Sequence, residues 1–161
     1  IKKTAPRFMM EISNTTKTKI NSKRITAISE AFLKKFKPDK TEVSLALVGD
    51  RRIRQLNRDY RKIDKATDVL SFSSASWEKK LLGEIIINPQ EIKRLSKYKE
   101  ILEFTGFNYP PKNLKIAENY LFYFIFVHGL LHLIGYDDAQ ESDRQIMLKL
   151  GRDFLAKRDI M

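Results

Sequence analysis

The sequence predicts an α+β fold in which a small four-stranded mixed sheet packs against helices, one of them long and central. Short runs with strand character fall in the first half of the chain, whereas the second half carries apolar residues in long helical segments. The 161 residues, 42% of them hydrophobic, suffice for one core and are too few for two comfortable domains. We therefore expect a single domain over residues 10–158, with 1–9 a leader remnant or a vector-derived stretch.

The first predicted elements are an edge strand at 11–12 and a helix over 20–36. In that helix, apolar side chains recur every three to four residues, at Ile25, Ile28, Phe32 and Phe36. Residues 42–48 instead alternate large apolar side chains with smaller ones, which is the two-residue period of a strand. These patterns predict a strand, a helix and a second strand, in that order.

A second helix is predicted after Asp50, which is placed to cap its N-terminus. Its apolar face carries Ile53, Leu56 and Tyr60. Two short runs at 69–72 and 84–87 are rich in β-branched, aromatic and other apolar residues and are bounded by residues that favour turns. They complete the expected set of strands.

Helices are predicted for most of the remaining chain: a short one after Pro89, a long one over 113–134 and a last one over 140–155. The apolar run 120–134 contains two histidines and a glycine. It is about fifteen residues long, whereas a membrane span needs about twenty predominantly apolar ones. We therefore interpret it as a buried core helix and expect no membrane partner.

Composition narrows the function classes. The chain has no cysteine, so any metal must be held by nitrogen and oxygen atoms, and a cysteine nucleophile is excluded. Its 31 Lys and Arg residues outnumber 20 Asp and Glu, and the formal net charge of +11 attracts polyanions such as nucleic acids. A solvated lysine-rich surface would give the same balance. The sequence shows no secretory leader, and we expect a cytoplasmic protein.

The two histidines of the chain, His128 and His132, lie four residues apart in the predicted long helix. This spacing places both imidazoles on one face, one turn apart, where they can share an ion. The alternative is a pair of core histidines satisfied by backbone carbonyls.

Gly129 occupies the position at which metalloproteases of the H-E-x-x-H type carry their general-base glutamate, so that mechanism of peptide hydrolysis is disfavoured. A glycine within a helix costs about 1 kcal/mol relative to alanine. We infer that either a neighbouring strand or a substrate approaches the backbone at this residue.

Gly135 is suited to the left-handed conformation just past a helix end, and a turn there would bring Asp137 or Asp138 back toward the histidines. A carboxylate would complete a three-ligand set with a fourth position open for water, as in catalytic zinc sites. Either aspartate could instead cap the helix that follows, and one could cap while the other ligates.

The segment from His128 to Asp137, His-Gly-Leu-Leu-His-Leu-Ile-Gly-Tyr-Asp, resembles the signature of the YbeY family of ribosomal-RNA maturation endoribonucleases. The family pattern continues with a third histidine, where this chain has Asp138. The resemblance implies that His128, His132 and Asp138 hold one Zn²⁺ ion as the cofactor. Because aspartate is anionic and harder than imidazole, this site could also admit manganese or another divalent ion.

Two further segments are similar to the same family. The first comprises 56–61, Asp64 and 66–72, and it departs from the pattern at Ser73, where the family usually has proline. The second is 83–87, in which Glu84 replaces the usual aspartate. With the histidine segment they run in family order from about residue 45 to 147, which is most of the chain.

By this resemblance Arg61 is the catalytic arginine, and it would bind the substrate together with Thr67 and Ser71. A guanidinium can hold a phosphate through two parallel hydrogen bonds and stabilise a pentacovalent phosphorus. From the residues alone, Arg61 could instead form a surface ion pair with Asp64 or Asp68, and Thr67 could cap a turn.

The resemblance implies a zinc-dependent endoribonuclease specific for single strands, acting in ribosomal-RNA processing at the 16S-type 3′ end and in ribosome quality control. Its partners would be single-stranded RNA precursors and the small ribosomal subunit with its proteins. The surplus Lys and Arg side chains would bind the RNA backbone without distinguishing its bases. The nucleophile could be either water or the RNA 2′-hydroxyl. Alternatives are a ribosome-associated assembly or RNA-binding factor with a structural metal and little catalysis, and a metallohydrolase acting on small molecules or peptides.

Overall fold

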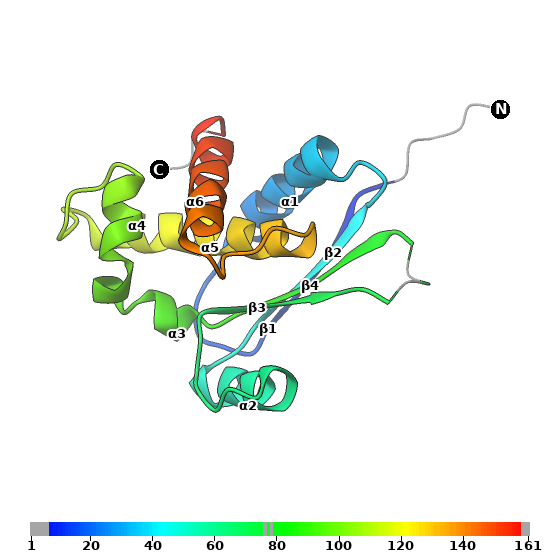
Figure 1. The fold of residues 1–161 in the computed structure, drawn as a ribbon, viewed down its shortest axis with the longest axis horizontal. Helices are drawn as coiled ribbons and strands as arrows, with labels where there is room; N and C mark the ends of the chain where they lie inside the picture. Colours follow the sequence, from blue (N-terminus) through cyan, green and yellow to red (C-terminus); the bar gives the residue numbers. More distant parts are fainter. Residues whose placement is uncertain (1–6, 76, 78, 159–161) are drawn as a thin grey trace.

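The computed structural model describes residues 7–75, 77 and 79–158, which form a sheet with helices on both faces (Figure 1). The sheet contains β1 (Met9–Asn14), β2 (Glu42–Leu47), β3 (Val69–Ser73) and β4 (Leu81–Ile87) in the order β1-β2-β4-β3. β2 pairs in parallel with β1 and β4, and β3 pairs antiparallel with β4. The predicted mixed four-stranded sheet and α+β class are confirmed.

Two helices, α1 (Ser22–Phe36) and α5 (Leu114–Leu133), cover one face of the sheet, and α6 (Glu141–Ala156) packs against α5 (Figure 1). α2 (Asp50–Arg61) covers the opposite face. The connection from β4 to α5 contains α3 (Pro89–Ile92), the 3₁₀ helix η1 (Leu95–Tyr98) and α4 (Lys99–Phe104). The last two were not expected from the sequence.

Two apolar clusters hold these layers together. The larger lies between the sheet and the α1, α5 and α6 layer, and its most buried aromatic members are Phe32, Phe124, Phe126 and Phe154. The smaller lies under α2 and consists of Val48, Ile53, Leu56, Leu70 and Ile86. β4 serves both clusters because alternate residues of a strand point to opposite faces. Accordingly, Ile85 and Ile87 belong to the larger cluster and Ile86 to the smaller one.

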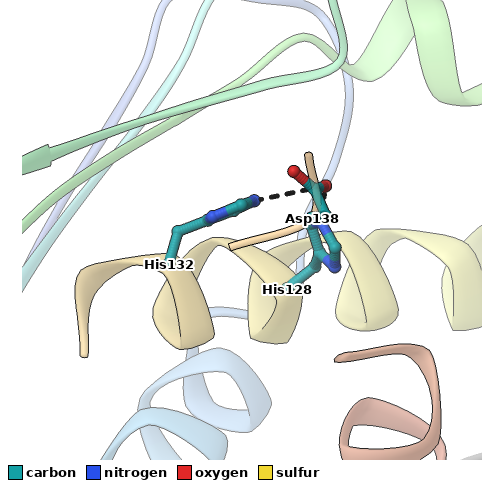
Figure 2. Close-up of side chains that lie close together, drawn as sticks. All are labelled: His128, His132 and Asp138. Atoms are coloured by element: carbon teal, nitrogen blue, oxygen red, sulfur yellow. Dashed lines mark hydrogen bonds and ion pairs between the residues drawn. The ribbon is translucent and has the colours of Figure 1, made fainter. Parts of the chain in front are cut away.

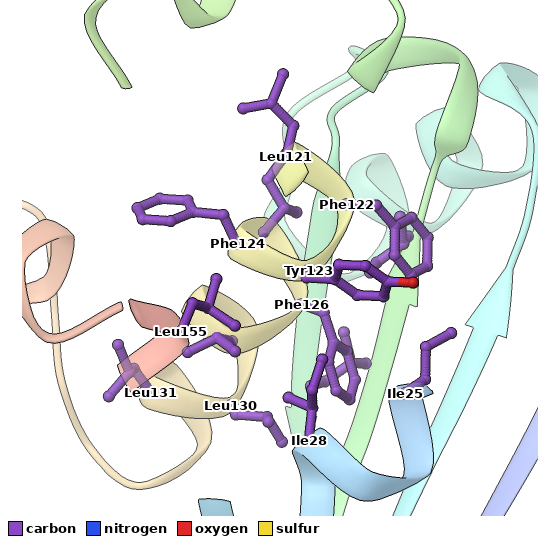
Figure 3. Packing of buried hydrophobic residues seen from close by; sticks show 14 of the residues in the cluster. Ile25, Ile28, Leu121, Phe122, Tyr123, Phe124, Phe126, Leu130, Leu131 and Leu155 are labelled. Atoms are coloured by element: carbon purple, nitrogen blue, oxygen red, sulfur yellow. The ribbon is translucent and has the colours of Figure 1, made fainter. Parts of the chain in front are cut away.

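α5 is the core helix of the molecule. By length and composition it could cross a membrane, but 72% of its most apolar window is buried inside the protein. Figure 3 shows its apolar side chains extending in several directions toward the surrounding elements. A helix that is apolar all round is buried in this way. The predicted core helix is confirmed.

Two boundaries differ from the sequence predictions. β1 begins at Met9, so the expected domain start at residue 10 falls within a strand, while residues 1–6 of the expected leader lie outside the described residues. The prediction that Asp50 caps α2 is wrong, because the cap position is Gly49. The Asp50 carboxylate instead accepts hydrogen bonds from Arg94 at 2.9 Å and Asn88 at 2.7 Å. The Arg94 hydrogen bond holds the pKa of Asp50 below its usual value.

Candidate metal centre

The chain turns back on itself at the C-terminal end of α5. Gly135 adopts a φ of +106°, in the left-handed region that favours glycine. Its N–H donates to the carbonyl of His132 at 3.0 Å, and the N–H of Tyr136 donates to the carbonyl of Leu131 at 3.1 Å. These are the two hydrogen bonds of a Schellman cap. The cap returns residues 136–138 toward the last turns of α5, as the glycine predicted.

Asp137 shapes the loop after this cap. Its Oδ1 accepts hydrogen bonds from the backbone N–H groups of Asp138 at 2.7 Å and Ala139 at 3.2 Å. Aspartate commonly stabilises a turn by such bonds to its own following backbone. The cap position of α6 is Gln140. Neither aspartate therefore occupies the cap of α6, and the Asp138 carboxylate faces the histidines (Figure 2).

Three side chains converge above the C-terminal half of α5 (Figure 2). Asp138 Oδ2 lies 3.1 Å from His128 Nε2 and 3.5 Å from His132 Nε2. The candidate ligand atoms of all three residues lie within 4.8 Å of one another. The two imidazole rings are nearly perpendicular, with centroids 4.7 Å apart. We call these three residues the donor group. Asp138, and not Asp137, is the carboxylate that joins it.

Only one of the two rings fits the alternative of core histidines satisfied by backbone carbonyls. His132 Nδ1 lies 3.0 Å from the carbonyl oxygen of Tyr136, so this nitrogen must be the donor and the lone pair resides on Nε2. His128 has no backbone partner, and its buried Nδ1 lacks a hydrogen bond within the described part of the chain. An unsatisfied buried polar atom is costly and is more typical of a functional site than of a packed core.

Electrostatics favour the protonation states that bind a metal. Burial lowers the pKa of His128, and neighbouring His132 acts in the same direction, against the charges of Asp138 and Asp68. Burial alone would raise the pKa of Asp138, but the hydrogen bond with His128 and the charges of both histidines outweigh it, and the pKa falls. A neutral imidazole and an ionised carboxylate are the forms in which these groups ligate.

The two separations from the Asp138 carboxylate have the dimensions of a divalent-metal site. Zinc bonds to nitrogen and oxygen are about 2.0–2.2 Å long, which separates two ligand atoms of a tetrahedral site by about 3.3 Å. The two separations from Asp138 Oδ2, 3.1 and 3.5 Å, bracket this value. The side chains of His128, His132 and Asp138 are 17%, 29% and 39% exposed. The group is therefore open to solvent, as a catalytic site must be.

Gly129 brings α5 close to the sheet beside the donor group. A Cβ atom at this position would lie 3.2 Å from both Ile85 Cγ2 and Ser71 Oγ, which is tighter than ordinary packing. The Ser71 hydroxyl donates to the Gly129 carbonyl at 3.1 Å. Packing against the strands therefore explains this glycine. It also places Ser71 next to the residue that follows His128.

From the sequence, Asp68 was considered only as a possible ion-pair partner of Arg61 and not as a site residue. Its charge acts to raise the pKa of His128, against the larger effect of burial, which lowers it. Asp68 Oδ2 accepts a hydrogen bond from the Tyr98 hydroxyl at 3.0 Å, and its Oδ1 lies 3.4 Å from Thr67 Oγ1. Asp68 directly precedes β3, within the segment 66–72 that is similar to the family, and this position could have marked it as a site residue. Thr67 is not one of the three residues of the donor group.

Arg61 is not part of the assembled donor group. It is exposed in the last turn of α2, on the sheet face opposite α5 (Figure 1). The ion pair with Asp64 or Asp68 that the sequence left open does not form, because Asp64 pairs with Arg54 at 2.9 Å and Asp68 with Tyr98. Over residues 7–75, 77 and 79–158, the Arg61 guanidinium has no ion pair.

Comparisons with known proteins point to one family. A family model described as Endoribonuclease YbeY matches residues 11–159. A protein of that name from Lacticaseibacillus casei is 34% identical over 74% of this chain and 74% of its own length. Another from Myxococcus xanthus is 35% identical over 85% of this chain, which spans 43% of that longer relative. A solution structure from Thermotoga maritima aligns with a TM-score of 0.48 at 23% identity, covering 93% of this chain and 91% of that one.

Proposed function

The chain belongs to the endoribonuclease YbeY family, and we propose that it is a metal-dependent endoribonuclease that cleaves single-stranded RNA. The observation that carries the proposal is the convergence of His128, His132 and Asp138 at one solvent-accessible point. The name shared by the relatives supplies the reaction class, and the net charge of +11 suits a polyanionic substrate.

The donor group would hold one divalent ion, which we propose to be Zn²⁺. When bound, such an ion supplies Lewis-acid chemistry by polarising a phosphoryl oxygen and lowering the pKa of nearby water. Two imidazoles and a carboxylate are a common ligand set for zinc. The carboxylate in place of a third imidazole makes Mn²⁺ the second candidate.

The chain's own residues prepare the site before RNA arrives. The Tyr136 carbonyl fixes the tautomer and the ring of His132, and the Asp137 turn fixes the loop that presents Asp138. The bond from Ser71 to Gly129 holds α5 against β3 next to His128. Such support keeps ligand atoms in place, so little reorganisation is needed when the reaction begins.

Arg61 would contact the scissile phosphate at the edge of the sheet. β3 is an edge strand that contacts α5, and on it Phe72 stacks edge-on against Tyr60 of α2 with ring centroids 5.2 Å apart. An RNA strand that crosses this edge would pass the donor group and then the end of α2. The guanidinium of Arg61 would there stabilise the additional charge on phosphorus, while Ser71 and Thr67 line the path.

We propose that the substrates are precursors of ribosomal RNA, cleaved at a 16S-type 3′ end, and the RNA of defective ribosomes. The reaction would take place in the cytoplasm, with the small ribosomal subunit as partner.

The products identify the nucleophile. Attack by the RNA 2′-hydroxyl leaves a 2′,3′-cyclic phosphate, whereas attack by water leaves a linear phosphomonoester. Mass spectrometry of the cleaved ends separates these outcomes.

A ribonuclease assay on a single-stranded RNA tests the proposal. We expect cleavage by purified protein, its loss with a chelator, and its return with Zn²⁺ or Mn²⁺. His128→Ala should abolish cleavage, since one of three metal donors is lost, and Arg61→Ala should slow it strongly. Cleavage that survives both substitutions would come from a contaminating nuclease and would refute the assignment.

The placement of α2, which carries Arg61, on the sheet face opposite α5 favours one second candidate, a ribosome-associated assembly or RNA-binding factor with a structural metal. This candidate predicts RNA binding and metal binding without cleavage by the metal-loaded wild-type protein. The same assay, combined with an RNA-binding measurement, separates the two functions.

A further inference from the structure

A cavity of about 840 Å³ lies on another side of α5, away from the donor group. It is open to solvent and is lined by the segment before α1, the first turn of α1, α3 and the N-terminal half of α5. Its volume is in the range of about 300–1,000 Å³ that small-molecule sites occupy. Neither the histidines nor Asp138 line it.

The cavity wall is strongly basic. Its cations are Lys17, Lys19, Arg24, Lys93 and Lys115. Glu118 is the single carboxylate among the lining residues. In the part of the chain that the structure describes, none of the five cations has an ion-pair partner. Cations without partners around one concave surface create a positive potential that attracts an anion.

Two helix N-termini add to this potential. The first turn of α1 and the first turn of α5 both border the cavity, and neither contains an acidic residue. The N-terminal end of a helix carries a partial positive charge that Asp or Glu commonly offsets. In this chain the first turns carry Arg24 and Lys115 instead, so each helix end adds to the charge of its cations.

The remaining wall is apolar and aromatic. Phe122 and Tyr123 of α5 meet edge to face with ring centroids 5.9 Å apart, and Ile20 and Ile92 lie in the same lining. Figure 3 shows Tyr123 with its hydroxyl pointing away from α5, on the side of α1. Burial raises the pKa of Tyr123, against the opposing charge of Arg24. The cavity thus combines aromatic side chains with nearby cations, the two features that bind a base and its phosphate.

We propose that this cavity binds one nucleotide of the single-stranded RNA, with the phosphate among the cations and the base against the wall that includes Tyr123. The identity of the ligand as RNA rests on the proposed function. Tyr123 and His128 are separated by about 140° around α5 and about 7.5 Å along it. The nucleotide held here therefore belongs to a part of the RNA outside the bond that is cleaved, and the cavity is an anchoring site.

RNA binding by the metal-stripped full chain tests this anchor without interference from cleavage. The probe is a fluorescein-labelled single-stranded RNA of about twelve nucleotides, within the range of known single-strand sites. The variant Arg24→Ala/Lys93→Ala removes two lining cations. The control Lys149→Ala/Lys157→Ala removes two exposed cations of α6 and its C-terminal cap that do not line the cavity.

We expect the cavity variant to weaken binding on the order of tenfold and the control to change it little. The slope of log affinity against log salt should fall in magnitude by about 0.7 in the cavity variant, since each phosphate contact of a single strand contributes about 0.7 and the cavity holds one phosphate. Equal affinities and equal slopes in the two variants would overturn the proposal.

A second variant separates the cavity from its rim. Asn119→Trp places a large ring at an exposed lining position without changing the charge, and it should also weaken binding. Normal binding by this variant would show that RNA contacts only surface cations, and that result would overturn the proposal. A free nucleoside monophosphate that binds as tightly as the RNA would also overturn it.

If the proposed function fails, cleavage is absent while the cavity variants still lose binding. If the anchor fails, cleavage persists and binding is unchanged.

Discussion

The C-terminal ends of α5 and α2 lie on opposite faces of the sheet and hold their polar side chains in different ways. At the end of α5, a glycine cap and an aspartate turn bring a carboxylate within 3.5 Å of two imidazoles. At the end of α2, Arg61 extends into solvent without an ion pair in the described part of the chain.

The donor group is assembled before the substrate binds, whereas the Arg61 guanidinium needs the substrate to bring it into position. The donor group is built from residues within eleven positions of one another, 128–138, so short-range hydrogen bonds can hold it. Arg61 belongs to an element packed on a separate apolar cluster, and nothing local directs it toward the histidines. We infer that metal binding precedes and does not require RNA, whereas placement of the guanidinium does.

The largest expected effect concerns the carboxylate of the donor group. Asp138→Asn removes its charge with little change of shape, and metal affinity should fall on the order of 100-fold. Losing a residue that only supports a metal ligand already costs up to about 100-fold. Asp137→Asn is the matched control, because an amide oxygen can still accept the two turn hydrogen bonds. Equilibrium dialysis with zinc measures both affinities, and equal losses would show that Asp138 is not a ligand.

A loss of similar size, but in turnover and not in metal affinity, is expected at the end of α2. Arg61→Ala should lower kcat for RNA cleavage by about 100-fold, a typical cost of losing one group that stabilises transition-state charge, with metal content unchanged. Arg58→Ala on the same helix is the control, since Arg58 is paired with Asp59 at 3.5 Å. Wild-type kcat in Arg61→Ala would remove this arginine from the mechanism.

The smallest effect tests how closely α5 must approach β3. Gly129→Ala gains about 1 kcal/mol of helix propensity but places a methyl group 3.2 Å from Ile85 and Ser71, and such overpacking costs about 1–3 kcal/mol. We expect a net loss of about 1 kcal/mol in the free energy of unfolding of the metal-free protein. Urea denaturation measures it. A more stable variant would mean that the strand contact is loose and that Gly129 has another purpose.

The two regions also show what the sequence can predict. The four-residue spacing of His128 and His132 and the glycine at 135 have local consequences, so the convergence of a following aspartate was predictable. That Asp138 and not Asp137 joins the histidines was not predictable, because it depends on which carboxylate accepts the hydrogen bonds of the turn. The position of Arg61 depends on the packing of α2 beneath Leu70 and Ile86, which periodicity does not reveal.

The same limit applies to the fold. The strand patterns and the long apolar helix predicted the class and most elements, since alternation and helical spacing are properties of single segments. The role of Asp50 was mispredicted because Arg94, forty-four positions away, competes for its carboxylate. The basic cavity was not foreseen, because its cations come from three separate stretches of the chain, at 17–24, 93 and 115.

X-ray absorption spectroscopy at the zinc edge, on protein purified and then loaded with one equivalent of Zn²⁺, tests the central claim most directly. Our account predicts scattering from two imidazole rings and from oxygen ligands, with bonds of about 2.0–2.2 Å. A spectrum of fully hydrated zinc, or one without imidazole scattering, would show that His128 and His132 do not share an ion.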